Sequence, residues 1–517
     1  MAHLSFAYAE NNLFFLGSAW QLYLKYPAPY RSTLAYTKPS SKIHSLGLCM
    51  NAGNEGEESK TKLQKVAGKI TGKVDRDRVV FQEYETKQVD RLFSNLEEAD
   101  GKIQRKEGSV VGATALVAGT TVGAGILALP AATVSTGVIP SSAVLIAMWV
   151  YMVASGLLIA ETNINTIVRE GKVNLGLLAI AERTIGEIGG RTAGLAYLFI
   201  HYALLVAYMA QGGGILKELV EKALGPSVAQ IPEVWGPVGF CALFGGLLVL
   251  GNEKQVESVN NAFVGVVILS FFGLLALTIP GIEIPRLLNQ NWSNAPATIP
   301  VMFVALVFHN VVPVITSQLE ADVKKIRQAI LSGSAIPLGM FLAWNAVILG
   351  SIDPPDVASG QVFDPLLVLR SGSSGDIVGQ TVSVFSIFAI VTSFVGFVLG
   401  LLDFLTDVFQ YEERDKAKEL PLYGLILLPP LLVACINPSI FFDALDNAGT
   451  YGISVLFGII PAAMAWQQRY GDDEPVATLP IVPGGKVTLL GMISFASLVI
   501  AQQGFGSIFE AITKNAG

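Results

Sequence analysis

Charged side chains are scarce in this 517-residue sequence. Lysine, arginine, aspartate and glutamate together make up 15% of it, while hydrophobic residues make up 52%. Soluble domains contain about 25% charged residues, so a series of water-soluble domains is not expected here. Most of the chain is instead predicted to lie in a lipid bilayer. The net charge of -7 comes without a concentrated basic patch, which argues against a nucleic-acid partner.

Cysteine is almost absent as well. Cys49, Cys241 and Cys435 are too few and too far apart for a disulfide framework or a zinc-binding knuckle. The sequence also lacks the HExxH motif of metalloproteases, the G-x-S-x-G nucleophile elbow and the G-x-x-x-x-G-K-S/T loop that binds ATP phosphates. We therefore expect no enzyme activity, no bound cofactor and no direct use of ATP. Nothing in the sequence indicates an obligate protein partner.

The first 109 residues differ from the rest of the chain. Residues 1–50 contain several serines and four basic residues, and Glu10 is their only acid. This composition is typical of an organelle transit peptide, although a disordered cytoplasmic tail would look similar. Residues 51–109 mix acidic and basic residues and are too polar to enter a membrane, so we interpret them as a disordered polar linker, with a local helix near residues 79–96.

Eleven apolar segments follow, and most approach the length of about 20 residues that crosses a bilayer as a helix. They are residues 110–136, 140–167, 192–219, 235–251, 256–280, 298–319, 326–352, 377–408, 421–436, 450–466 and 488–501. Lysine and arginine concentrate in alternate loops, which fits an odd number of helices with the linker on the positively charged side. The apolar runs are continuous, which excludes membrane strands. The predicted fold is an all-α integral membrane protein, with a transmembrane domain over residues 110–505 and a tail over 506–517.

Two of these segments carry residues that interrupt helices. The first contains three glycines within seven residues, and each glycine weakens a helix by about 1 kcal/mol relative to alanine. The sixth contains His309 and Asn310, which are costly in lipid, and Pro313, which cannot donate a backbone hydrogen bond. Close helix packing is the alternative explanation for the glycines. Broken first and sixth helices predict a transporter of two inverted five-helix repeats, over residues 110–281 and 298–467, with an extra helix over 488–503.

Half-helices of this kind can bind a zwitterion. Their N-termini offer free N–H groups and a positive dipole end to a carboxylate, while unwound carbonyl groups suit a cation. An amino acid carries both charges, so the sequence predicts an amino acid as substrate. The candidate substrate-binding residues are Gly119, Thr120, Thr121, Gly123, Ala124, Gly125, Tyr208, Gln211, Phe308, His309 and Asn310.

Glu161 and His309 are the candidates for coupling transport to protons. Glu161 is the clearest acid inside an expected helix, and we expect it to hydrogen-bond the loose backbone near the breaks. Its alternative position is the headgroup region at the helix end. The imidazole of His309 titrates near neutrality when unperturbed, although it could equally be a neutral structural group. Tyr208 and Gln211 lie one turn apart and could reach the substrate, or could anchor at an interface.

Four segments resemble the tryptophan/tyrosine permease branch of the hydroxy and aromatic amino acid permeases, within the amino acid, polyamine and organocation superfamily. They are AGTTVGAGILALP at residues 118–130, LLIAETN at 157–163, PVMFVALVFHNVVP at 300–313 and AIVTSFVGFVLGLLDFLTD at 389–407. The resemblance implies a leucine-transporter-like core in which helices one, two, six and seven rock against a scaffold. Similar bacterial proteins are proton-driven importers of aromatic amino acids. Val307 and Val314 replace the glycine and serine common in that family, which leaves the substrate open.

The resemblance also bears on the coupling ion and on location. Sodium-coupled relatives of this fold hold an ion between helices one and eight, and the matching positions are Gly119, Val122, Ala389, Thr392 and Ser393. The two hydroxyls could instead bond their own helix. Proton coupling is favoured, and a sodium-coupled or uncoupled carrier of another neutral amino acid, or a channel or transceptor, are the alternatives. The N-terminal extension resembles that of plant plastid members, which implies the chloroplast inner envelope with the linker in the stroma.

Overall fold

The computed structural model describes residues 96–99, 102–105, 108–170, 175–225, 232–352, 363–371, 375–409, 416–471, 476 and 478–516. The expected transit peptide and most of the linker lie outside the described residues. Part of the linker forms a hairpin, in which strand β1 (Leu96–Ala99) pairs antiparallel with strand β2 (Lys102–Arg105). The composition did not predict this hairpin. All the other described elements are helical, as the apolar runs predict.

The contacts divide the chain into two units. One comprises residues 76–401 and 423–517, and it contains the interrupted helices and everything packed around them. The other comprises residues 1–75 and 402–422; its described residues are the end of helix α15 and the beginning of helix α16. The following paragraphs concern the first unit, apart from those two helix ends.

The first half of the transmembrane domain contains five spans. Their elements are α3 (Val110–Thr121), α4 (Gly125–Thr133), α5 (Val138–Glu170), α6 (Leu177–Leu224), α7 (Trp235–Phe240), η2 (Cys241–Gly245), α8 (Gly246–Leu250) and α9 (Glu253–Thr278). Gly186 interrupts α6 with a φ of 78°, so the membrane span begins after it. The short elements η3 (Ile279–Gly281), α10 (Ile284–Leu287) and η4 (Trp292–Thr298) connect the two halves.

The second half begins with α11 (Ile299–Ala305), η5 (His309–Val311), α12 (Val312–Gln318) and α13 (Val323–Ser351). It continues with α14 (Pro365–Arg370), α15 (Asp376–Phe409), α16 (Lys416–Ile436), α17 (Phe441–Asn447), η6 (Ala448–Ile459), α18 (Ile460–Trp466), η7 (Gln467–Gly471) and α19 (Gly485–Ala516). The elements η6 and η7 are π-helical, which the sequence did not predict.

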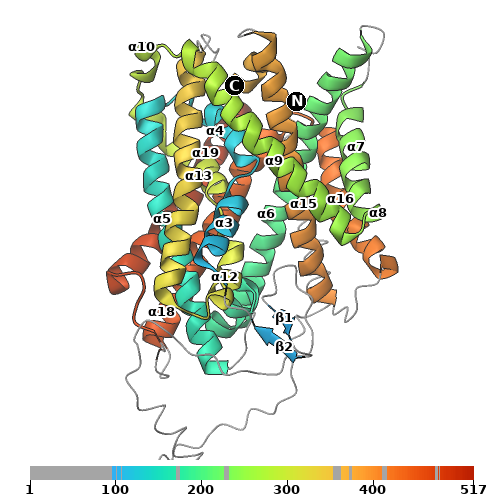
Figure 1. Cartoon of the computed structure of the whole chain (residues 1–517). Coiled ribbons are helices and arrows are strands. Elements are labelled where there is room, and N and C mark those ends of the chain that lie inside the picture. Colours follow the sequence, from blue (N-terminus) through green and yellow to red (C-terminus); the bar gives the residue numbers. More distant parts are fainter. Residues whose placement is uncertain are drawn as a thin grey trace, which may run out of the picture. The chain divides into compact units, whose positions relative to one another are not determined.

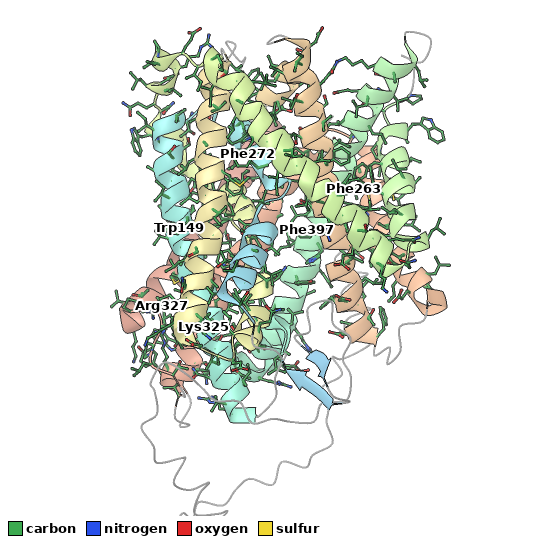
Figure 2. The ribbon with its side chains drawn as sticks, in the orientation of Figure 1. Trp149, Phe263, Phe272, Lys325, Arg327 and Phe397 are labelled. Atoms are coloured by element: carbon green, nitrogen blue, oxygen red, sulfur yellow. The ribbon has the colours of Figure 1, made fainter. Side chains whose placement is uncertain are left out.

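The described helices agree with the predicted number of spans. Nine of them are long and apolar enough to cross a membrane, and the pair α3 and α4, bent by 54°, makes a tenth. The shorter apolar helix Trp235–Leu250 coincides with the predicted fourth span. The protein is therefore a multi-pass membrane protein. Figure 1 shows α9 running obliquely past the other helices. Its apolar residues Leu269 and Phe272, the second of which is labelled in Figure 2, are 76% and 59% exposed, as suits a surface that faces lipid.

Buried polar side chains join three spans to one another. Asn345 on α13 accepts a hydrogen bond from Thr133 Oγ1 on α4 at 2.7 Å and donates one to Ser141 Oγ on α5 at 3.0 Å. Trp149 on α5 donates to Ser334 Oγ on α13 at 3.0 Å. Because polar groups in hydrocarbon are costly when unpaired, these bonds favour the close packing of spans one, two and seven. The resemblance assigns these spans, with span six, to the moving bundle.

Candidate functional site

The first span is interrupted between α3 and α4. Val122 has an extended conformation with a ψ of 99°, and helical structure resumes at Gly125. In a continuous helix the N–H of Ala124 would donate to the carbonyl of Thr120. It donates instead to Ser393 Oγ on α15, at 2.8 Å. The glycine-rich segment therefore unwinds, as predicted, and a side chain from span eight satisfies part of its backbone.

The sixth span is interrupted between α11 and α12. The last bond of α11 runs from Leu306 N–H to Met302 O, at 3.1 Å, and α12 starts at Val312 with Pro313 in its first turn. Proline suits this position because the first N–H groups of a helix have no acceptor within it. Among the described residues, no backbone or side-chain acceptor receives the N–H groups of Val307 and Phe308. These groups precede the N-terminus of α12, where an anionic group is stabilised.

The two breaks contact each other through Gly125. A Cβ atom at this position would lie 2.8 Å from Ala305 Cα, closer than real Cβ atoms approach another atom. Gly123 makes a similar approach to span eight, because a Cβ there would lie 2.7 Å from Ser393 Oγ. These glycines allow the backbones of three spans to meet at one place. Asn310, in the second break, is exposed, so this polar region is accessible from outside the packed interior.

Tyr208 joins the same cluster from span three. It is 2% exposed, and its hydroxyl is hydrogen-bonded to the side chain of Ser393. Its ring lies edge-on to Phe397 of α15, with centroids 5.7 Å apart. Ala124, Ser393 and Tyr208 therefore form one hydrogen-bonded group from spans one, eight and three.

The two hydroxyl residues at the sodium-like positions, Thr392 and Ser393, form hydrogen bonds with different partners. Thr392 Oγ1 donates to the carbonyls of Phe388 and Ala389 in its own helix, at 3.0 and 3.1 Å. Ser393 Oγ instead points to the break of span one, where it accepts the Ala124 N–H. The alternative of a hydroxyl that bonds its own helix thus applies to Thr392 and not to Ser393.

The other candidate residues on α3 lie beside the break. Thr120 Oγ1 and Thr121 Oγ1 donate to backbone carbonyls one turn earlier, at 2.9 and 2.7 Å. Gly119 is exposed, and a Cβ there would meet nothing within 4 Å. Gln211 is partly exposed on α6. Their contact with a substrate stays a prediction.

Phe308 and His309 pack away from the exposed side of the second break. The Phe308 ring lies against Gly156 on α5, where a Cβ would be 2.7 Å from Cε2. The His309 ring is fully buried and stacks between Phe308 and Phe457, with centroid distances of 4.7 and 4.6 Å. Neither ring nitrogen has a hydrogen bond of acceptable geometry among the described residues, although the Met152 backbone lies beside the ring.

Glu161 has a partner that differs from the expected one. Its carboxylate accepts two hydrogen bonds from the guanidinium of Arg469, at 2.6 and 2.7 Å, and a third from Ile481 N–H at 2.7 Å. The two side chains are 2% and 4% exposed. We expected Glu161 to bond the loose backbone at the breaks. The structure instead places it in an ion pair that connects span two with the end of span ten, because a buried carboxylate is stabilised most by an opposite charge.

Sequence reasoning missed Arg469, Gln468 and Phe457 as partners of the candidate residues. Gln468 donates to Thr166 Oγ1 at 3.1 Å and accepts from Asn165 Nδ2 at 3.0 Å, next to the ion pair. In the sequence, Arg469 is one of several basic residues that follow an apolar segment, and nothing there distinguishes it from the others. Glu161, as an acid inside an expected membrane helix, indicates that a positively charged partner is needed. The sequence does not indicate which arginine or lysine that partner is.

The arrangement is that of a membrane transporter. Two spans are interrupted at the same place, their backbones touch, and unpaired N–H groups lie beside an exposed amide side chain. The chain belongs to the tryptophan/tyrosine permease family, whose model matches residues 106–503. It is therefore a permease rather than an enzyme.

Individual relatives cover most of the chain. It is 29% identical over 397 residues to the tyrosine-specific transport system 1 of Haemophilus influenzae, covering 75% of this chain and 95% of the relative. It is 27% identical over 424 residues to the tryptophan-specific transport protein of the same organism, covering 79% and 99%. A solved structure of MhsT in complex with L-phenylalanine is similar at 16% identity and a TM-score of 0.49, covering 77% of this chain and 98% of that one.

Replacing Gly125 by alanine should destabilise the protein and abolish transport. The new Cβ would overlap the Ala305 backbone, which cannot move aside as a flexible side chain can. Overpacking of this kind costs about 1–3 kcal/mol. The matched control is Gly119→Ala, which meets no atom within 4 Å and should retain the melting temperature of the parent in detergent. Equal melting temperatures for the two variants would contradict the contact between the breaks.

Glu161→Leu and Arg469→Leu should each lower the melting temperature sharply. Either change leaves an unpaired charge in a buried place, which costs about 3–5 kcal/mol. The double variant should be more stable than either single variant, because it leaves no unpaired charge and only two backbone groups, Ile481 N–H and the Val482 carbonyl, without their partners. A double-variant cycle in detergent measures this coupling. If the double variant loses as much stability as the two single variants together, the two side chains do not depend on each other.

Proposed function

We propose that the protein is a secondary active carrier of aromatic amino acids, with tyrosine and tryptophan as first candidates. The observation that carries the proposal is the contact of the two interrupted spans at Gly125 and Ala305, beside the unpaired N–H groups of Val307 and Phe308. Such N–H groups suit the carboxylate of an amino acid. The names of the curated relatives support tyrosine and tryptophan over other zwitterions.

The substrate would lie among neutral groups. The polar side chains described at the breaks are the hydroxyls of Ser393 and Tyr208, the amide of Asn310 and the imidazole of His309, and no carboxylate, ammonium or guanidinium group is among them. A free anion or cation would need a charged partner in this place. A zwitterion has no net charge, so backbone dipoles at the two half-helices can balance its two ends. The eleven candidate residues around the breaks are proposed as its binding site.

The coupling cation is proposed to be a proton. Ser393 Oγ, the hydroxyl that would bind sodium between spans one and eight, already accepts the Ala124 N–H and is bonded to Tyr208. The other hydroxyl, of Thr392, bonds its own helix. This pairing disfavours a sodium ion at Gly119, Val122, Ala389, Thr392 and Ser393. Glu161 and His309 remain candidates for binding the proton. Because both side chains are buried, each would exchange a proton with water only after a change of conformation.

Purified protein in proteoliposomes should exchange labelled tyrosine or tryptophan against unlabelled amino acid inside. Exchange should saturate, because a carrier binds its substrate on each side before it moves it. An imposed pH gradient should drive accumulation, and an imposed sodium gradient should not. Phenylalanine, glutamine and leucine serve as the comparison panel. A channel would give flux without acceleration by internal substrate, and absence of exchange with every neutral amino acid would exclude the proposed function.

We further propose that residues 1–50 direct the protein to the chloroplast inner envelope, with the polar linker in the stroma. Their basic, serine-containing and acid-poor composition supports an organelle address. A fluorescent protein fused after residue 100 should enter chloroplasts and lose part of the extension on import. A matched fusion that starts at residue 51 should remain in the cytosol. Cytosolic fluorescence of both fusions would contradict plastid targeting.

A further inference from the structure

A second group of polar residues lies between α6 and α15, about two helical turns from the Ser393 cluster. His201 is 3% exposed, and its ring lies against that of Tyr197 at an angle of 31°, with centroids 3.9 Å apart. The ring of Phe397, a residue labelled in Figure 2, also contacts His201, with centroids 4.9 Å apart. Phe397 also touches Tyr208, so one aromatic ring separates His201 from the hydrogen-bonded group at the break.

The hydrogen bonds of His201 determine which ring nitrogen is free. Nδ1 lies 2.8 Å from the carbonyl oxygen of Tyr197. A carbonyl only accepts, so Nδ1 carries the hydrogen and Nε2 of the neutral ring is left with a lone pair. Nε2 faces the backbone of α15 at Gly400, where a Cβ atom would lie 3.3 Å away. The Tyr197 hydroxyl donates to the Gly400 carbonyl at 3.1 Å. A basic nitrogen thus lies in the seam between spans three and eight.

The surroundings of His201 suit a group that binds a proton reversibly. Two aromatic rings lie within the range of about 6 Å at which a cation is attracted to a ring face. No charged residue occurs in α15 between Ile377 and Leu401. In the part of the chain that the structure describes, the elements that pack on α6 carry these ionisable side chains: Tyr151, Glu161 and Arg169 on α5, Glu419, Tyr423 and Cys435 on α16, Asp443 and Asp446 on α17, Tyr451 on η6, and Arg469 and Tyr470 on η7. Glu161 and Arg469 are paired with each other, and Asp403 follows Gly400 by one turn on α15. An acid that would hold the proton permanently is therefore not in contact with His201 among the described residues.

His309, the other described histidine, differs in this respect. Both of its ring nitrogens are buried between Phe308 and Phe457, with the Met152 backbone beside the ring. Protonation would place an additional N–H between these apolar rings. His201 already satisfies one nitrogen and keeps the other available.

We propose that His201 is the proton-binding residue of the transport cycle. The inference rests on the proposed function, since it requires that the carrier be coupled to protons. A proton passes from a hydronium ion to Nε2, which forms an N–H bond and leaves a water molecule. On the other side of the membrane this N–H bond breaks and water takes up the proton. His201 lies on the same two helices as Ser393 and Tyr208, about two turns away, so substrate at the breaks and a proton at the seam can move in one cycle.

The test is tyrosine transport by wild-type protein and His201→Gln in proteoliposomes. With the membrane potential held at zero, a pH gradient of one unit should let the wild type accumulate substrate about tenfold, the ratio equivalent to about 1.4 kcal/mol. His201→Gln should still exchange tyrosine without a gradient but accumulate none in response to pH. Tyr202→Phe, which removes the neighbouring hydroxyl that donates to the Leu425 carbonyl at 2.9 Å, is the matched control and should keep its response to the pH gradient. Full accumulation by His201→Gln would overturn the proposal.

If His201→Gln loses exchange altogether, the proposal is tested by measuring how tyrosine binding changes the melting temperature. Tyrosine should raise the melting temperature of the wild type by an amount that depends on pH, because the binding of substrate and of proton are linked in one cycle. A shift independent of pH in His201→Gln supports the assignment, and an unchanged pH dependence refutes it. Wild-type protein that exchanges tyrosine but ignores the pH gradient would remove this inference and leave the carrier function intact. Absence of any exchange by the wild type would instead remove the carrier function itself.

Discussion

The contact between the two interrupted spans is the constraint on which the rest of the structure depends. Inside a bilayer, a backbone group without a partner costs several kcal/mol, so a broken helix persists only where neighbouring groups satisfy it. Ser393 accepts the N–H of Ala124, and Pro313 begins α12 without an N–H of its own. The missing side chain of Gly125 lets α11 approach closely. The backbone N–H groups of Val307 and Phe308, which have no acceptor among the described residues, are then available to a solute.

The buried polar residues outside the breaks stabilise the helices around them. Asn345 connects spans one, two and seven, and the pair of Glu161 and Arg469 connects span two with span ten. The only full charges among these groups neutralise each other. The polar side chains described at the breaks are then hydroxyls, an amide and the imidazole of His309, without a carboxylate or ammonium group. A site of this kind selects a solute whose own charges cancel, which is the property that separates an amino acid from a simple ion.

The positions of the breaks were predictable because glycine and proline act on the backbone where they stand. The roles of the polar side chains were less predictable. Thr392 and Ser393 are neighbours in sequence but point about 100° apart around α15, and only Ser393 reaches span one. Glu161 pairs with a residue 308 positions away, and no local pattern indicates such a partner. The hairpin β1–β2 and the π-helical η6 were also missed, because each depends on pairing or packing that composition does not record.

The sequence by itself determined how many times the chain can cross a membrane, where two of those crossings are interrupted, and which family the chain resembles. Hydrophobicity and backbone chemistry are local properties, so they can be read along the chain. The tertiary structure decided that Ser393 and Tyr208 meet the first break, that His309 is stacked between aromatic rings, and that Glu161 lies in an ion pair. These results depend on how each helix is rotated about its axis and on which distant helix lies beside it. Both are set by packing and not by any single segment.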